Sequence, residues 1–313
     1  MPTIESIEAA RHEYADMLRE KCGLRNARLL EALAKVPRED FLGRGPWIVS
    51  DLSLKPRYTP DDNPAHLYKD VLVSIDSSRG LNNGMPSGLI KWIDALDLHE
   101  SDTAVHAGCG PGYYTALIAS VVGERGRVVA YDIDGNLAQR AKSNLTSFAN
   151  VEVRAADASK YDPGPADAIL INAGATHPLD LWLDSMKEGG RMIFPLVRWP
   201  MGAIFGQGVA GWGAMMRVRR LAGGIFGSRS LAGRGAMMRV RRDAADRYAA
   251  SCVGPVGMFP CFGALDREAD RLLEQAWSTP VTEVRSLRRE RHDKESSCWL
   301  HGAGYCFSRN DPG

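Results

Sequence analysis

The sequence predicts an α/β fold built on a Rossmann-like, doubly wound and mostly parallel sheet. Short apolar runs alternate with helix-compatible stretches through the middle of the chain, as in successive β-α-β units. A glycine-rich turn, Gly108–Gly112, follows one such run and precedes a helical stretch. Aspartates, Asp132 and Asp157, close the next two runs. In a doubly wound fold these features would gather at the carboxyl edge of the sheet, where ligands bind.

The composition excludes several classes of protein. The 313 residues carry a net charge of +1, so nothing in the overall charge favours nucleic acid or a membrane surface. No apolar run approaches the ~20 residues that span a bilayer. The first residues are charged throughout, so we expect no signal peptide. Six cysteines lack C-x-x-C spacing, which predicts reduced thiols in a cytoplasmic protein.

Three segments are expected along the chain. Residues 1–65 form an N-terminal helical cap and a wrapping loop. Within it, helices run from Thr3 to Gly23 and over 26–35, and the proline-rich stretch 43–64 is predicted as loop. Residues 66–200 form the core, and residues 201–313 add C-terminal strands, a helix and an antiparallel extension.

The core elements follow from their hydrophobic patterns. Its expected strands cover 70–76, 104–107, 126–132, 151–154, 166–171 and 191–195. Its expected helices cover 89–98, 113–122, 136–148 and 179–186.

The C-terminal segment contains a tandem duplication within 202–242. The letters GAMMRVRR occur at 213–220 and again at 235–242, and we expect one copy to supply a strand. The arginines could contact RNA, but their alternation with apolar residues favours a strand with one solvated face. Further strands are expected at 253–262, 281–285 and 297–308, with a helix over 266–277.

The predicted last strands contain three residues of metal-ligating types. Cys298, His301 and Cys306 are metal-ligating types, but no fourth ligand stands out in the sequence. Because structural zinc sites have four ligands, we expect packed side chains and no metal here.

The spacing of the glycine turn decides between two cofactor classes. A dinucleotide fingerprint needs G-x-G-x-x-G, whereas the third glycine position here is Tyr113. The pattern is G-x-G-x-G. Asp132 lies 20 positions after Gly112, where an acid at the end of the second strand receives ribose hydroxyls.

Several ordered motifs together resemble the protein-L-isoaspartate O-methyltransferase family, within the class I S-adenosylmethionine-dependent methyltransferases. The resemblance covers roughly residues 25–200. The motifs are VPREDF at 36–41, YKD at 68–70, the loop 80–86, the turn 108–112 and GGRMIFP at 189–195.

The resemblance implies S-adenosyl-L-methionine as cofactor and assigns residues to it. The turn glycines would pass under its methionine part, Asp132 would accept the ribose hydroxyls, and Asp157 with Ala158 would meet the adenine amino edge. Asp132 could instead cap a helix, and Asp157 could be a turn residue. The full expected cofactor set is Gly108, Cys109, Gly110, Gly112, Asp132, Ile133, Asp157, Ala158 and Asn172.

Two positions depart from the family pattern. His106 stands where the family usually has an acid, and Gly84 stands where it has its active-site serine. Asn82 or Asn83 could supply the missing donor or could simply form a turn, so the expected catalytic set is Asn82, Asn83 and Gly84. A hydroxyl acceptor would need a base, for which His177 is the candidate.

Three functions remain open on the sequence. The first is a carboxyl O-methyltransferase acting on a peptide or protein carboxylate, as the resemblance implies. The second is a methyltransferase of the same scaffold with another small-molecule or peptide acceptor. The third is a non-catalytic relative that binds a cofactor or a partner.

Overall fold

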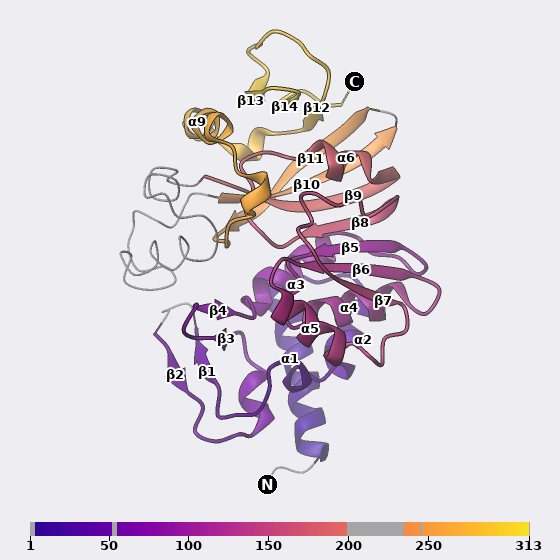
Figure 1. Cartoon of the computed structure of the whole chain (residues 1–313), viewed down its shortest axis with the longest axis vertical. Coiled ribbons are helices and arrows are strands. Elements are labelled where there is room, and N and C mark those ends of the chain that lie inside the picture. Colours follow the sequence, from indigo (N-terminus) through magenta and orange to yellow (C-terminus); the bar gives the residue numbers. More distant parts are fainter. Residues whose placement is uncertain (1–3, 52–54, 199–234, 245, 313) are drawn as a thin grey trace. The chain divides into compact units, whose positions relative to one another are not determined.

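The computed structural model describes residues 4–51, 55–198, 235–244 and 246–312 (Figure 1). The chain divides into two units. The first comprises Met1–Ala104 and Cys109–Ala156, and the second comprises Val105–Gly108 and Asp157–Gly313. The three-segment division expected from the sequence stays a prediction. Among the described residues, no helix is long and apolar enough to cross a membrane.

Two N-terminal helices open the first unit, as predicted. Helix α1 (Ile4–Cys22) is followed by Gly23, whose φ of 66° lets the chain leave the helix. Helix α2 (Ala27–Lys35) begins where the Asn26 side chain accepts the Leu29 N–H at 3.1 Å. The apolar face of α2 is buried in the first unit.

The prediction that 43–64 is only loop is wrong, because short strands form within it. A small antiparallel sheet has the order β2-β1-β3-β4. Its strands are β1 (Ile48–Ser50), β2 (Arg57–Tyr58), β3 (Leu72–Asp76) and β4 (Leu81–Asn82). The prolines lie outside the paired residues, so they do not remove ladder hydrogen bonds. Trp47 and Val49 pack there with Leu67 and Val73.

A buried arginine joins separate parts of the first unit. Arg38 is 0% exposed, and its guanidinium donates to the carbonyls of Leu67 at 2.6 Å, Lys69 at 3.2 Å and Val71 at 2.9 Å. These bonds satisfy a charge that would be costly to bury alone. The VPREDF motif therefore positions the segment that leads into β3.

The β-α-β pattern of the first unit matches the prediction closely. Strands β6 and β7 pair in parallel, with Val128 opposite Val151 and Asp132 opposite Ala155. The Arg127 N–H donates to the carbonyl of Asp102, just before β5. The elements are α3 (Pro86–Ala95), β5 (Thr103–Ala107), α4 (Tyr113–Val122), β6 (Arg127–Asp132), α5 (Gly135–Asn144) and β7 (Val151–Ala155).

The second unit combines a parallel pair with an antiparallel extension. Strands β8 and β9 are parallel, and the strands beyond β9 run antiparallel in the order β13-β14-β12-β11-β10-β9. This confirms the predicted fold class. The elements are β8 (Ala166–Ile171), α6 (Asp180–Asp184), β9 (Met186–Val197), β10 (Gly235–Ala244), β11 (Arg247–Val256), α9 (Arg267–Ala276), β12 (Ser286–Arg288), β13 (Cys298–Gly302) and β14 (Tyr305–Ser308).

The second copy of the duplicated segment forms β10, so one copy supplies a strand as expected. Arg239 in β10 lies opposite Ile193 in β9, and β11 pairs on its other side. The first copy, 213–220, lies outside the described residues.

Three C-terminal strand predictions differ from the structure. The segment predicted as one strand at 297–308 forms two antiparallel strands, β13 and β14. The strand predicted at 253–262 lies earlier in the chain, as β11 (Arg247–Val256), because it forms a hairpin with β10 that turns at Asp246, whose φ is 58°. Residues Val281–Glu283 form a 3-10 turn after Pro280, and the strand follows as β12.

Replacing Arg38 with Met should lower the free energy of unfolding by about 3 kcal/mol, because three carbonyls, those of Leu67 and Val71 buried, lose their donor. Urea denaturation followed by circular dichroism measures this. Arg125→Met removes a guanidinium whose side chain is 77% exposed, and it should change stability by less than about 0.5 kcal/mol. Equal losses in the two variants would contradict the role given to Arg38.

Candidate functional site

The turn after β5 needs glycine for both its backbone angles and its packing. Gly108, Gly110 and Gly112 have φ values of 77°, 55° and 102°, in the left-handed region that side chains disfavour. A Cβ on Gly112 would lie 2.8 Å from Leu145 Cδ1. At Gly110 the nearest atom would be Ile75 Cδ1, 4.0 Å away, so a ligand can approach the main chain there.

Asp132, at the end of β6, holds this turn. One carboxylate oxygen accepts the Gly110 N–H at 2.8 Å and the other accepts the Asp134 N–H at 2.9 Å. Burial raises the pKa of Asp132, and the two N–H donors only partly offset that rise. Each oxygen keeps acceptor capacity for a further donor. The alternative that Asp132 caps the next helix is wrong, since Asp134 caps α5 by accepting the Asn136 and Leu137 N–H groups.

Sequence reasoning missed an arginine in the same unit. Arg79 Nε lies 2.6 Å from Asp76 Oδ2, and its Nη1 pairs with Asp134. The guanidinium therefore links the loop after β3 to the start of α5, next to Asp132. A basic residue opening a glycine- and asparagine-rich loop was the signal available in the sequence.

Ile133 follows Asp132 and presents its side chain to solvent. It is 51% exposed, which is unusual for a large apolar residue beside a buried sheet. An exposed apolar side chain next to buried hydrogen-bond acceptors fits a ligand with a flat apolar face and polar edges.

The two asparagines of the loop after β3 behave differently. The Asn82 side-chain carbonyl accepts the Gly84 N–H at 2.9 Å, so Asn82 forms a turn. The Asn83 side chain is buried, and its Nδ2 has no hydrogen-bond partner among the residues that the structure describes. Asn83 therefore offers an unused donor.

Gly84 has a φ of 78°, and a Cβ there would lie 2.9 Å from Leu89 Cδ2. A serine would be strained in this backbone conformation by about 1–2 kcal/mol. Compared with the family's serine, Gly84 therefore changes the backbone conformation of the loop in addition to removing a hydroxyl group.

In the second unit, Asn172 follows β8 and contacts Gly108. Its Nδ2 donates to the Gly108 carbonyl at 3.2 Å, and its N–H donates to the Ala107 carbonyl at 2.8 Å. The buried Asn172 Oδ1 has no partner within the described part of the chain. A Cβ on Gly108 would lie 3.0 Å from the Asn172 carbonyl oxygen, so glycine is needed for this close approach.

Asp157 is a turn residue, the alternative left open by the sequence. Its Oδ1 accepts both the Ser159 N–H at 3.0 Å and the Ser159 hydroxyl at 2.6 Å. Burial raises its pKa, but the Ser159 and Lys160 donors outweigh this and leave the pKa low. The neighbouring Ala158 carbonyl accepts Trp182 Nε1–H at 3.0 Å.

Three further polar groups have shifted ionisation. Burial lowers the pKa of His106 to about 4, so this histidine is neutral at neutral pH and cannot replace the family's acid as a charge. Burial also lowers the pKa of His177, which contacts Thr176 Oγ1 at 3.1 Å. Burial raises the pKa of Cys109, which is therefore a packed thiol.

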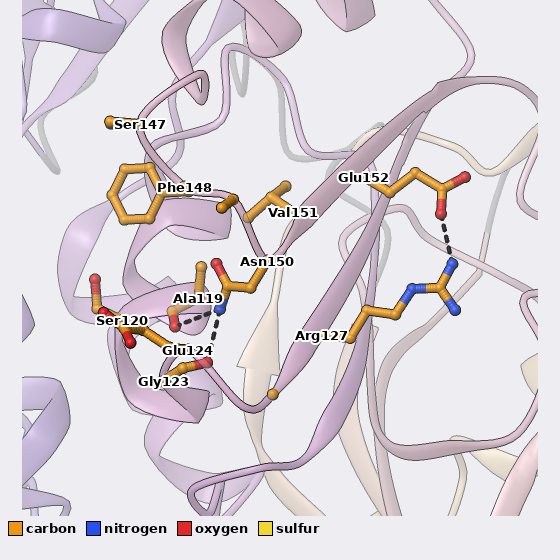
Figure 2. A pocket seen from close by; sticks show the side chains of 12 residues that line it. Ala119, Ser120, Gly123, Glu124, Arg127, Ser147, Phe148, Asn150, Val151 and Glu152 are labelled. Carbon is orange, nitrogen blue, oxygen red and sulfur yellow. Dashed lines mark hydrogen bonds and ion pairs between the residues drawn. The ribbon is translucent and has the colours of Figure 1, made fainter.

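A pocket lies near the amino ends of β6 and β7 (Figure 2). Asn150 donates there to the carbonyls of Ala119 and Gly123, and Arg127 pairs with Glu152. Arg127 and Val151 begin β6 and β7. Because ligands of open α/β sheets bind at the carboxyl ends of strands, we do not assign this pocket to the cofactor.

Comparison with known proteins shows the family of this chain. The family model for protein-L-isoaspartate(D-aspartate) O-methyltransferase (PCMT) matches residues 10–201. The chain belongs to this family. PCMT membership makes it an S-adenosyl-L-methionine-dependent methyltransferase, so the non-catalytic alternative is not retained.

Named relatives support the same family. Protein-L-isoaspartate O-methyltransferase 2 of Archaeoglobus fulgidus is 29% identical over 196 residues, 60% of this chain and 80% of the relative. The Methanopyrus kandleri protein-L-isoaspartate O-methyltransferase is 30% identical over 192 residues, 60% of this chain and 76% of the relative.

Solved structures share the fold. A protein-L-isoaspartate O-methyltransferase gives a TM-score of 0.58 at 19% identity, covering 86% of this chain and 69% of its own. A Plasmodium falciparum protein of similar description, crystallised with S-adenosyl-L-homocysteine, gives 0.55 at 13% identity, covering 80% of this chain and 97% of its own.

Stability should fall between pH 7.5 and pH 5 in a way that depends on His106. The folded pKa of about 4 lies below the value of about 6.5 expected when unfolded, so below pH 6.5 the unfolded chain takes up a proton that the folded chain refuses. This one group should cost about 2 kcal/mol at pH 5. Urea denaturation of His106→Leu should show a correspondingly smaller pH dependence, whereas the exposed His12→Gln should behave as the parent. An unchanged pH dependence in His106→Leu would count against this assignment.

Proposed function

We propose that this methyltransferase transfers the methyl group to a carboxylate, and that its acceptor is an isoaspartyl residue in a peptide or protein. Membership of PCMT supports this, because the family description names that reaction. The observation that carries the proposal is the buried Asn83 amide donor without a partner in the described residues, in the loop where the family binds its acceptor. A carboxylate is the acceptor group that such a donor suits.

We further propose that the expected cofactor residues bind S-adenosyl-L-methionine. The cofactor, when bound, supplies a methyl group on a positively charged sulfur. In the first unit, the free acceptor capacity of Asp132 suits ribose hydroxyls, and the exposed Ile133 suits an adenine face. The open main chain at Gly110 suits close approach, with Cys109 and Gly112 fixing the turn.

In the second unit, the residues proposed for the same cofactor are Gly108, Asn172, Asp157 and Ala158. The Asn172 Oδ1, an acceptor without a partner in the described residues, suits an ammonium group. The Oδ1 of Asp157 accepts the hydrogen bonds of the turn with Ser159. Its Oδ2 takes no part in that turn and lies 3.2 Å from the exposed Lys160 ammonium, so Oδ2 is the atom proposed to meet the cofactor.

In the proposed reaction the protein mainly has to place the acceptor carboxylate against the cofactor's methyl group. A carboxylate is ionised at neutral pH, so it attacks without a general base. Orientation and exclusion of water can contribute about 7–11 kcal/mol to such a displacement. In this proposal Asn83 orients the acceptor, and Asn82 and Gly84 hold the loop.

A second acceptor class follows from Gly84. The left-handed backbone and the nearby Leu89 do not suit the serine that the family has there. A small molecule or a modified peptide with a different carboxylate environment is therefore the alternative acceptor. The expected cytoplasmic location remains a prediction, and the six cysteines, which are free thiols in the structure, fit it.

Asp132→Asn should weaken binding of S-adenosyl-L-homocysteine by about 10-fold or more, because an amide loses acceptor strength and introduces a donor facing the Gly110 or Asp134 N–H. Isothermal titration calorimetry measures the affinity. Glu124→Gln, at the pocket of Figure 2, should bind as the parent does. Loss of binding in Glu124→Gln, with Asp132→Asn unaffected, would contradict the proposed site and assign the cofactor to the pocket of Figure 2.

With an isoaspartyl peptide and labelled cofactor, the parent enzyme should transfer the methyl group, and Asn83→Ala should lower kcat/KM by about 10-fold or more. The exposed Asn136→Ala is the matched control and should retain activity. If cofactor binds but the peptide is not methylated, the isoaspartyl acceptor is wrong and the alternative acceptor class stands.

A further inference from the structure

Four metal-ligating side chains meet near the C-terminus, in the second unit. His292, Cys298, His301 and Cys306 each offer one ligand atom, and these atoms all lie within 4.8 Å of one another. The sequence indicated Cys298, His301 and Cys306 as metal-ligating types but no fourth ligand, so no metal site was expected. The fourth is His292, which lies in a charged stretch that no periodic pattern connects to the strands.

The local fold explains the meeting. In the β13–β14 hairpin, His301 lies opposite Cys306, and an irregularity in the pairing follows Cys298 at the start of β13. The segment between β12 and β13 forms a loop next to this hairpin (Figure 1) and brings His292 to Cys298. Ligands from a hairpin and an adjoining loop are a common way to build a small zinc site.

The separations suit a tetrahedral metal ion. Cys298 Sγ lies 3.5 Å from His292 Nε2 and 3.8 Å from His301 Nδ1. Zinc with ordinary bond lengths to sulfur and nitrogen places such atoms about 3.6 Å apart in a tetrahedron. The two histidine rings meet edge to face at 4.8 Å between centroids, so their nitrogens converge without stacking.

Outer contacts orient two of the ligands. His292 Nδ1 lies 3.0 Å from the Glu290 carbonyl, which can only accept a hydrogen bond. Nδ1 therefore carries the proton, and Nε2 turns a lone pair toward the cluster. The Glu295 N–H donates to Cys298 Sγ at 3.3 Å. A histidine held through its second nitrogen and a sulfur that accepts a backbone N–H are the supporting contacts of metal sites.

We propose that His292, Cys298, His301 and Cys306 bind one zinc ion in a closed structural site. The two thiols would each release a proton on binding, and no electron transfer is involved. Thiolate and imidazole ligands select zinc over magnesium or calcium. Four protein ligands leave no position for a substrate, so the ion fastens the 289–297 segment to the hairpin. Both cysteines are buried, whereas the histidines are partly exposed.

The test uses the full-length protein, purified under reducing conditions from zinc-supplemented cells. Elemental analysis should find equimolar zinc, and the loss of one thiolate in Cys298→Ser or Cys306→Ser should reduce it severalfold or more. Cys252→Ser and His12→Gln are matched controls outside the cluster and should retain zinc. Cobalt in place of zinc should give the intense absorption of tetrahedral thiolate coordination in the parent protein.

The cobalt spectrum keeps the test decisive even if the cysteine variants fold poorly. Parent protein that holds no zinc, or a Cys298–Cys306 disulfide found by mass spectrometry under reducing purification, would overturn the proposal. Zinc retained at parental level by both Cys298→Ser and His292→Gln would also overturn it. Binding of S-adenosyl-L-homocysteine by the same samples separates this outcome from any failure of the proposed function.

Discussion

The hydrogen bond from the Gly110 N–H to the Asp132 carboxylate is the contact on which the candidate site depends. It ties the glycine turn to the end of β6, and the neighbouring Cys109 N–H donates to the Tyr131 carbonyl. The same carboxylate accepts the Asp134 N–H and so sets the start of α5. One buried acid thus fixes a turn, a strand end and a helix start together. Its cost is desolvation, which the two N–H donors reduce.

A second set of contacts in the first unit connects the loop after β3 to Asp134, whose N–H donates to that acid. Arg79 pairs with Asp76 at the end of β3 and with Asp134 at the start of α5. Asn82 then folds the chain back to Gly84. These bonds hold the loop in place without using the Asn83 amide. A loop that is fixed by its neighbours and keeps one buried donor without a partner in the described residues fits the proposed role of Asn83 in orienting a carboxylate acceptor.

The C-terminal extension lies beyond the part of the chain that the family model matches. It begins with β10, which adds to the edge of β9, and it ends in the β13–β14 hairpin. The hairpin buries Trp299, Leu300 and Phe307, whereas the charged connection before it is mostly exposed. The proposed zinc site supplies the missing cross-link between that connection and the hairpin.

Sequence patterns were sufficient where the structure is local. The helices α1, α2 and α4, the parallel strands β6 to β9, and the glycine turn follow from periodicity, caps and the backbone freedom of glycine. The short strands β1 and β2 were missed because proline spacing resembled loop, and pairing with β3 is a long-range choice.

At the candidate site, the sequence by itself singled out the residues proposed to carry the chemistry: the glycines, Asp132 and the asparagines. Only the tertiary structure decided which contacts each of them makes. It made Asn82 a turn residue and left the Asn83 amide without a partner in the described chain. It also brought His292 to Cys298, because side chains remote from any periodic pattern meet only when strand register and loop path are fixed.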